Sequence, residues 1–297
     1  MKFGASILAL AFSGAAAFQP AAVPRTSETA LFSMTPIAGT GASGAGVAPV
    51  AGRTMAAPGL VRAAGVPTEQ IWDMSQPITV QGGSLKTWSF PSPFVERVQI
   101  VMRTDGRPLD ANLELWQGPD NTPYKMRVYV EDGMARTFSA VIETPRDEQN
   151  TISIRNTAQL EFPLVAGVVS EDVRGGPPLG DRQVSERPST IQGGALRTYP
   201  FNPSVESVQV LLTTDGRPLN ARIELLQGPN NIKQVMEVYT EDGMERPFYA
   251  VVETPGTGNV VRVVNTASME FPMTAAVEAF EIGDGRYWSD GVLLGGM

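Results

Sequence analysis

A regular alternation of apolar and polar side chains runs through the C-terminal two thirds of the chain. Apolar residues fill every second position from Leu109 to Leu115, with Asp, Asn and Glu between them. The same two-residue period returns in residues 124–131 and 138–142, and Val95–Met102 is a run rich in β-branched side chains. A two-residue period places alternate side chains on opposite faces of an extended strand. The pattern therefore predicts half-buried β-strands.

The strand pattern occurs twice. Residues 78–169 and 189–277 align with a single-residue gap in each of two loops, and the strings QGG, TDGRPL, QGP, EDGM, ETP, NTA and EFP recur in the same order. A period of about 110 residues is far longer than the periods of solenoid repeats. It indicates two tandem copies of one whole domain.

Asp-Gly dipeptides separate several of the expected strands, at 105–106, 132–133, 215–216 and 242–243. Both residue types accept positive φ, so these sites are predicted to close tight hairpins. Neither copy contains a sustained helical period with caps. We therefore expect an all-β fold of two tandem homologous antiparallel β-sandwich domains after a disordered N-terminal targeting leader.

The composition of the segments outside the two repeats indicates where the domains begin and end. The connector between the copies contains Gly-Gly-Pro-Pro and charged residues, which predicts a surface linker. The expected segments are a signal peptide at 1–17, a transit-like disordered segment at 18–68, sandwich repeats at 69–169 and 189–281, the linker at 170–188 and a C-terminal docking tail at 282–297.

The N-terminus has the features of a targeting leader. Lys2 precedes a short apolar stretch at 7–12, and an A-x-A cleavage site ends at Ala17. From Phe18 to residue 68 there are three arginines and one acid, a composition that is typical of transit peptides and too poor in apolar residues to order itself. The AAAFQP junction resembles the bipartite plastid leader of algae whose plastids derive from a red-algal endosymbiont. Ala17 and Phe18 are thus predicted targeting residues; a secretory signal followed by a disordered pro-segment is the alternative.

The 297-residue chain contains no histidine and no cysteine. This removes the commonest general base near neutral pH, the thiolate nucleophile and the two commonest zinc ligands. Ser-His-Asp and Cys-His catalysis are excluded, and no disulfide can form. We expect no enzymatic activity, no catalytic residue, no cofactor and no metal site.

The net charge of the chain bears on whether it binds nucleic acid or membranes. The whole chain carries −8, and residues 1–68 hold four of its 23 basic residues and one of its 31 acids, so the remainder carries −11. Nucleic-acid binding depends on neutralising phosphates, and anionic membrane surfaces attract basic segments. The sequence therefore predicts no nucleic-acid partner and no membrane insertion after processing.

Two alternative functions use side chains that remain available. A glycosidase needs only two acids across a cleft. The candidate acids are Glu114, Glu143, Glu224 and Glu253. Each has a twin in the other repeat and an outward or strand-end position, so we interpret them as solvated. A carbohydrate-binding module would need an aromatic platform. The candidates for it are Trp88, Trp116, Tyr129 and Tyr199.

Two repeated loop motifs also have two interpretations. TDGRPL could grip an anion through Arg107 and Arg217, and EDGM could belong to an acidic calcium loop. No D-x-D-x-D-G spacing accompanies EDGM. We interpret both motifs as hairpin turns, in which Asp-Gly makes the turn.

A tandem repeat also suits assembly. If the two copies carry related patches on opposite sides, molecules can join head to tail into open sheets or tubes, and sandwich edges are natural joining sites. Aromatic side chains often anchor such contacts. The candidate assembly residues are Trp72, Trp116, Tyr287 and Trp288.

The AAAFQP leader, the paired QGG-x-L-x-T, TDGRPL, QGP-x-N, EDGM and E-x-F-P segments, and the terminal RYWSDG together resemble the diatom pyrenoid shell proteins. The resemblance covers roughly residues 70–297. It implies a structural protein of the plastid stroma that assembles with itself, and with related shell proteins and Rubisco as further partners, into a sheet or tube around the Rubisco-filled pyrenoid. Such a shell would support carbon dioxide concentration and fixation. A carbohydrate- or ligand-binding tandem module of a plastid or secreted protein is the alternative.

Overall fold

The computed structural model describes residues 54–55, 68–92, 94–118, 120–144, 149–171, 179, 185 and 187–283. These residues form 17 strands and one helix, α1 (Thr68–Met74). All strand pairings are antiparallel, and the strands form two sheets. The predicted all-β antiparallel fold is confirmed.

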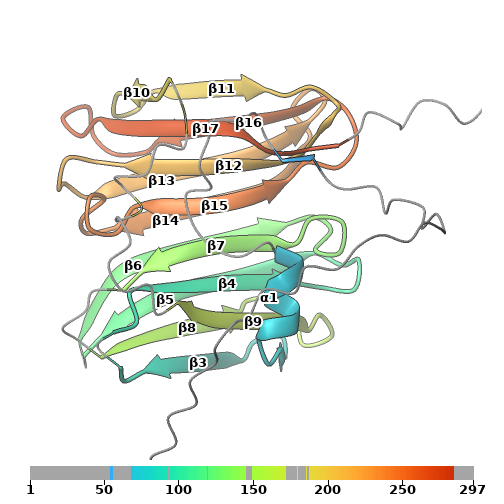
Figure 1. Ribbon diagram of the computed structural model, residues 1–297, viewed down its shortest axis with the longest axis vertical. Helices are drawn as coiled ribbons and strands as arrows, with labels where there is room; N and C mark the ends of the chain where they lie inside the picture. The colour runs from blue at the N-terminus through green and yellow to red at the C-terminus, as the bar shows by residue number, and fades with distance from the viewer. Residues whose placement is uncertain are drawn as a thin grey trace, which may run out of the picture. The chain divides into compact units, whose positions relative to one another are not determined.

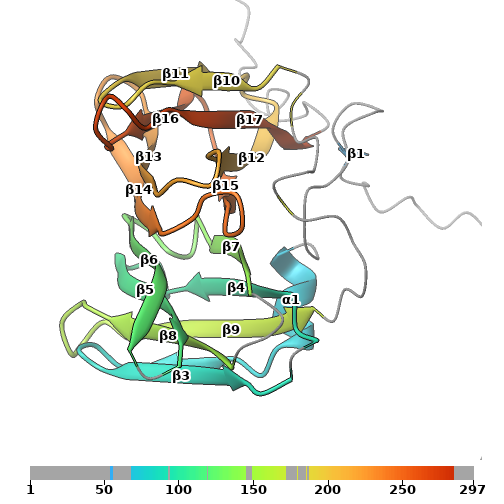
Figure 2. The same cartoon turned by 90° about the vertical axis from the view of Figure 1, so that its left-hand side faces the viewer.

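Strands of the two sheets alternate along much of the chain. The nine-stranded sheet contains β1 (Thr54–Met55), β2 (Ile78–Val80), β4 (Arg97–Arg103), β7 (Phe138–Glu143), β9 (Leu164–Glu171), β10 (Ser189–Ile191), β12 (Val205–Thr213), β15 (Phe248–Glu253) and β17 (Met273–Ile282). The eight-stranded sheet contains β3 (Leu85–Phe90), β5 (Leu109–Gln117), β6 (Asn121–Val130), β8 (Asn150–Asn156), β11 (Leu196–Pro200), β13 (Leu219–Gln227), β14 (Ile232–Thr240) and β16 (Asn259–Asn265). Figures 1 and 2 show the two layers from perpendicular directions.

The two repeats share both sheets. The eight-stranded sheet runs in the order β11-β16-β13-β14-β6-β5-β8-β3, so β14 of the second repeat pairs with β6 of the first. In the other sheet β15 pairs with β7. One hydrophobic core fills the space between the sheets across both repeats. The prediction of two tandem domains is not confirmed, because the repeats join edge to edge.

The joint has a local two-fold relation. Arg127 lies opposite Glu237, and these are equivalent positions of the two repeats. Ala140 likewise lies opposite its own equivalent, Ala250. An antiparallel pairing that is centred on equivalent residues relates its two sides by a two-fold rotation, as in an isologous dimer interface. We call this joint, formed by β6, β7, β14 and β15, the seam.

The outer faces of the two sheets differ in burial. Along β5 every second side chain is half exposed, as the alternation predicted, and the same holds along β16. Along β7 and β15 five successive side chains are buried, because the outer face of the nine-stranded sheet is also covered. The helix α1, whose Ile71 is fully buried, covers β4 and β9, and the connector residue Leu179 packs on Val141 of β7 and Tyr249 of β15.

Three sequence expectations change here. The helix was missed, because seven residues span too few turns for a helical period to stand out. The linker prediction of a purely surface segment is wrong at Leu179 and Ser185, which are buried. Thr54–Met55, inside the segment predicted to be disordered, pair with the end of β17 as β1.

The Asp-Gly sites also differ from expectation. Each connects a strand of one sheet to a strand of the other, so the hairpin prediction is wrong for all four. Gly106 has φ 71°, a left-handed conformation that favours glycine. Gly133 has a different reason, since a Cβ there would lie 2.5 Å from the Thr104 hydroxyl. The hairpins within a sheet instead join β5 to β6 and β13 to β14, at the QGP motifs.

Candidate assembly interface

Reciprocal side-chain hydrogen bonds connect the repeats at the seam. Arg136 Nη2 donates to Gln227 Oε1 at 3.0 Å, and Arg246 Nη2 donates to Gln117 Oε1 at 3.2 Å. Arg136 is equivalent to Arg246, and Gln117 to Gln227, so one contact is made twice with the roles exchanged. All four residues belong to motifs or loops that the duplication repeated. The seam therefore has the self-complementary character of an isologous contact.

Backbone contacts extend the seam symmetrically. Glu131 N donates to Lys233 O at 2.8 Å, and Glu241 N donates to Pro123 O at 2.9 Å. On one side only, Lys233 Nζ also forms an ion pair with Glu131 Oε2 at 2.6 Å, because proline occupies the equivalent position 123. The seam thus keeps its backbone symmetry while its side chains have diverged.

Burial affects the electrostatics of Arg136. Its side chain is mostly removed from water, which lowers the pKa of the guanidinium from its usual value, and the nearby carboxylates of Glu131 and Asp132 oppose that effect. A buried charge of this kind is stabilised by its hydrogen bond to Gln227. Arg136 therefore ties the loop after β6 to the opposite repeat.

Tyr124 in β6 is fully buried at the seam, and its hydroxyl has no hydrogen-bond partner among the described residues. Burial raises the pKa of Tyr124. Tyr124→Phe is therefore expected to keep or increase stability near neutral pH, because it removes an unpaired buried polar group.

Above pH ~10, the ordinary pKa of tyrosine, the phenol ionises only in the unfolded chain, which favours unfolding of the wild type. The Tyr124→Phe variant lacks this contribution from residue 124. Chemical denaturation at pH 7 and at higher pH should therefore show a growing stability advantage for the variant. A variant that is less stable at both pH values would contradict an unpaired hydroxyl.

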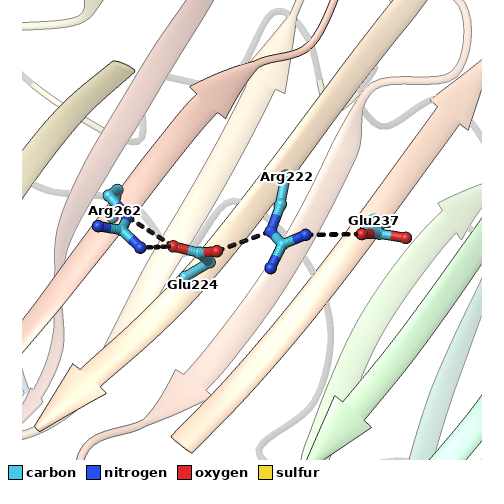
Figure 3. A network of polar contacts seen from close by, with 4 residues as sticks. All are labelled: Arg222, Glu224, Glu237 and Arg262. Carbon is cyan, nitrogen blue, oxygen red and sulfur yellow. Dashed lines mark hydrogen bonds and ion pairs between the residues drawn. The ribbon is translucent and has the colours of Figure 1, made fainter. Parts of the chain in front are cut away.

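The outer face of the eight-stranded sheet carries a chain of four charged side chains (Figure 3). Arg262 Nε donates to Glu224 Oε2 at 2.5 Å, and Arg222 Nε donates to Glu224 Oε1 at 2.6 Å. Arg222 Nη1 then reaches Glu237 Oε1 at 3.0 Å. The network ties β16, β13 and β14 together, and Glu224 at its centre is buried although it points outward.

The first repeat lacks this network. Its equivalents of Arg222, Arg262 and Glu237 are Asn112, Ser153 and Arg127. Glu114, the equivalent of Glu224, instead accepts a hydrogen bond from Trp116 Nε1 at 2.8 Å. We call the outer face of the eight-stranded sheet the open face. Its charged side chains therefore differ between the two repeats, although the backbone pairing is the same.

These twin acids give a matched test. Glu224→Gln should lower the free energy of unfolding by about 1–3 kcal/mol, because both arginines lose a charged hydrogen-bond acceptor. Glu114→Gln should have a smaller effect, since an amide oxygen still accepts from the indole. Thermal melts of both variants would compare them. Equal effects would show that the arginine pair contributes little.

A hollow of about 530 Å³ lies over the seam on the open face, lined by residues of β5, β6, β13 and β14. Its charged side chains include Arg127 and Lys125 on one side and Arg222 and Glu237 on the other. Within the described residues no group of three or more acidic side chains is placed to hold a metal ion. The lining of the hollow thus combines charged side chains of both signs with apolar surface.

Two of the four candidate assembly residues lie within the described part of the chain. Trp72 is half-buried in α1, where the Arg103 guanidinium lies 4.4 Å from its ring centroid. Trp116 is half-buried on the open face. The two belong to opposite outer faces and do not form one patch. Tyr287 and Trp288, and the targeting residues Ala17 and Phe18, lie outside the described residues.

The residues proposed for the alternative functions are dispersed. Trp88 and Tyr199 pack against the core from the inner side of the edge strands, whereas Trp116 and Tyr129 lie on the outer face, so the four aromatics do not form one platform. Among the candidate acids, Glu224 is held by two arginines, and Glu143 pairs with Arg97 at 3.4 Å. These partners account for both carboxylates as structural groups.

In each repeat, the loop that carries TDGRPL contacts the loops that carry EDGM and E-x-F-P. Arg107 lies over the Phe162 ring at 5.2 Å, and Arg217 lies over Phe271 at 5.7 Å, so both arginines pack on aromatic rings. Asp132 Oδ1 accepts hydrogen bonds from the amides of residues 134 and 135. These contacts are those of structural loops, but the interpretation of TDGRPL and EDGM as hairpins is wrong, because each motif joins strands of different sheets. Sequence reasoning missed Leu179, for which a lone leucine among glycines and prolines gave the only signal.

No helix in the described ranges is long and apolar enough to cross a membrane. The arrangement is that of an all-β protein made from two copies of one sandwich unit, which are joined at a two-fold seam and leave an outer strand at each side of both sheets. A family model for the diatom pyrenoid shell protein matches residues 72–279. The chain belongs to this family. Membership identifies it as a structural shell protein of the pyrenoid, within the plastid.

The chain was also compared with curated proteins and with solved structures. No curated protein matches the chain. Among solved structures, YhhW from Escherichia coli is 10% identical with a TM-score of 0.21, over 63% of this chain and 78% of that one. The infectious bursal disease virus VP2 subviral particle is 12% identical with a TM-score of 0.15, over 69% and 79%. Scores this low support no argument about fold or function.

Proposed function

We propose that the protein assembles with itself into a sheet or tube that encloses the Rubisco-containing pyrenoid of a diatom plastid and so supports carbon dioxide concentration and fixation. The proposal includes import into the stroma under the direction of residues 1–68, with Ala17 and Phe18 at the first cleavage site. Related shell proteins and Rubisco are its proposed partners, and it requires no cofactor or catalytic residue.

The observation that carries this proposal, beside family membership, is the way the repeats already join. The seam shows that one sandwich half associates with another through its sheet edges, using backbone hydrogen bonds and a few reciprocal side-chain contacts. Each molecule has a further pair of outer strands at the far side of each half. A unit with joining edges on two opposite sides can form open assemblies rather than closed dimers.

Electron microscopy of the purified compact unit, residues 50–297, tests the proposal. The expected result is concentration-dependent formation of sheets or tubes, which sedimentation would quantify. Discrete monomers at all concentrations would contradict self-assembly. A glycan array on the same material tests the carbohydrate-binding alternative, and saturable binding without assembly would favour it.

A further inference from the structure

The outer edge of the eight-stranded sheet consists of two equivalent strands, β3 in the first repeat and β11 in the second. They are the terminal strands of that sheet. Leu85, Lys86, Thr87, Trp88 and Phe90 correspond to Leu196, Arg197, Thr198, Tyr199 and Phe201. The duplication has thus retained residue type at nearly every position of an exposed strand. Packing within the molecule explains the aromatic residues but not the outward leucine and threonine.

Strand direction permits these edges to pair between molecules. Eight antiparallel strands alternate in direction, so β3 and β11 at the two ends of the sheet run opposite to each other. A second copy displaced along the sheet therefore brings its β11 antiparallel to β3 of the first. The same step can be repeated without limit, because each added copy presents another β3.

The hydrogen bonds already made by β3 identify its free backbone groups. Gly83 N donates to Asn156 O, and Asn156 N donates to Ser84 O. Because bonded and non-bonded pairs alternate along an antiparallel ladder, the amides of Leu85, Thr87 and Ser89 point away from β8. These three residues provide the donors and acceptors of the free edge.

The same alternation applies to β11. Asn265 N donates to Ala195 O, and Phe201 N donates to Asn259 O. The free positions are therefore Leu196, Thr198 and Pro200. Pro200 has no amide hydrogen, and an outward-facing edge position is one of the few strand positions where proline is tolerated. Its carbonyl remains available as an acceptor.

We propose that β3 of one molecule pairs with β11 of the next, with Thr87 opposite Thr198, so that the eight-stranded sheet continues from copy to copy. This rests on the proposed function, and names the surface that performs it. The register is centred on equivalent residues, as at the seam. It places Leu85 opposite Pro200 and Ser89 opposite Leu196, all on the outer face.

The inner-face pairs of this register are chemically complementary. Lys86 lies opposite Tyr199 of the next copy, and Trp88 lies opposite Arg197. Each cation thereby faces an aromatic ring across the strands, a favourable contact for cross-strand neighbours. An inward-pointing charge on an edge strand can also act to prevent pairing. In that case neither edge would associate, and the experiment below distinguishes the two roles.

The absence of native cysteine makes disulfide trapping a direct test. In the full chain, Thr87→Cys with Thr198→Cys places two thiols on opposed residues about 5.5 Å apart between Cα atoms, within disulfide range. Within one molecule the same residues lie on opposite edges of an eight-stranded sheet, about 33 Å apart at the usual strand spacing. Any 87–198 disulfide therefore joins two molecules.

Leu85→Cys with Leu196→Cys is the matched control, since both positions face outward on the same edges but are four residues out of register. Mild oxidation of assembled protein should give a ladder of covalent oligomers at least tenfold stronger for the 87/198 pair. Equal cross-linking of the two pairs, or none in either, would overturn the proposed register.

A proline variant provides a second readout. Thr87→Pro removes an amide that points away from β8, so the monomer should fold, as a circular dichroism melt can verify. The loss of one edge hydrogen bond should raise the concentration needed for assembly about fivefold to tenfold. Thr87→Ala, which keeps the amide, should assemble nearly normally. If the wild-type protein and Thr87→Pro assemble equally well, the proposed edge pairing is wrong but the proposed shell function stands. If the wild-type protein never assembles, the proposed function itself is wrong.

Discussion

Replacement of Leu179 by alanine is expected to lower the free energy of unfolding by about 2–4 kcal/mol. Leu179 is 0% exposed and packs with Val141, Leu211 and Tyr249 on the outer face of the nine-stranded sheet. Val141 and Tyr249 are opposed residues of β7 and β15, so the leucine covers the seam itself. Its amide also donates to Glu143 Oε1 at 2.5 Å. Truncation would leave a cavity where the two repeats meet.

A thermal melt measures this effect, and a fall of about 5 °C or more is expected for a unit of this size. Leu160→Ala is the matched control, because Leu160 is 80% exposed and should tolerate truncation. If the two variants melt alike, the connector does not stabilise the seam.

Removal of the Trp288 side chain is expected to weaken assembly strongly while leaving the monomer intact. We propose that Tyr287 and Trp288 dock on a neighbouring molecule, because aromatic side chains are enriched where interfaces gain their energy. β17 ends at Ile282, so both residues follow the last strand of the described fold. Loss of a central aromatic anchor typically costs 2 kcal/mol or more, roughly a thirtyfold change in affinity per contact.

Sedimentation of Trp288→Ala across a concentration series should show assembly beginning at a concentration about thirtyfold higher, with an unchanged melting temperature. Tyr287→Phe keeps an aromatic ring and should assemble nearly as the wild type does. A lower melting temperature with normal assembly would instead show that the tail packs on its own molecule.

Much of the architecture follows from the pattern of residues. The alternation in Leu109–Gln117 correctly predicted a strand with one buried face, because a two-residue period assigns side chains to faces whatever the neighbouring strand is. The duplication correctly predicted that both repeats contain corresponding strands. Of the candidate assembly residues, Trp116 continues the alternation of β5 and lies on the outer face, as that period predicts. The sequence could not show that Glu224 on the same face would be enclosed by Arg222 of its own strand and Arg262 of the neighbouring strand β16.

The sequence by itself determined the strands, their core-facing side chains and their repetition, but not the burial of the outer side of β7 and β15. Only the tertiary structure decided that β6 joins β14 and β7 joins β15, that the Asp-Gly turns cross between sheets, and that Leu179 covers the seam. The physical reason is that strand pairing uses backbone hydrogen bonds, and every residue except proline carries both the donor and the acceptor for them. A local pattern therefore indicates which side chains face the core, whereas the choice of neighbouring strand depends on packing between residues far apart in the chain. Arg136 contacts Gln227, which is 91 positions away, and Tyr124 lies opposite Thr240.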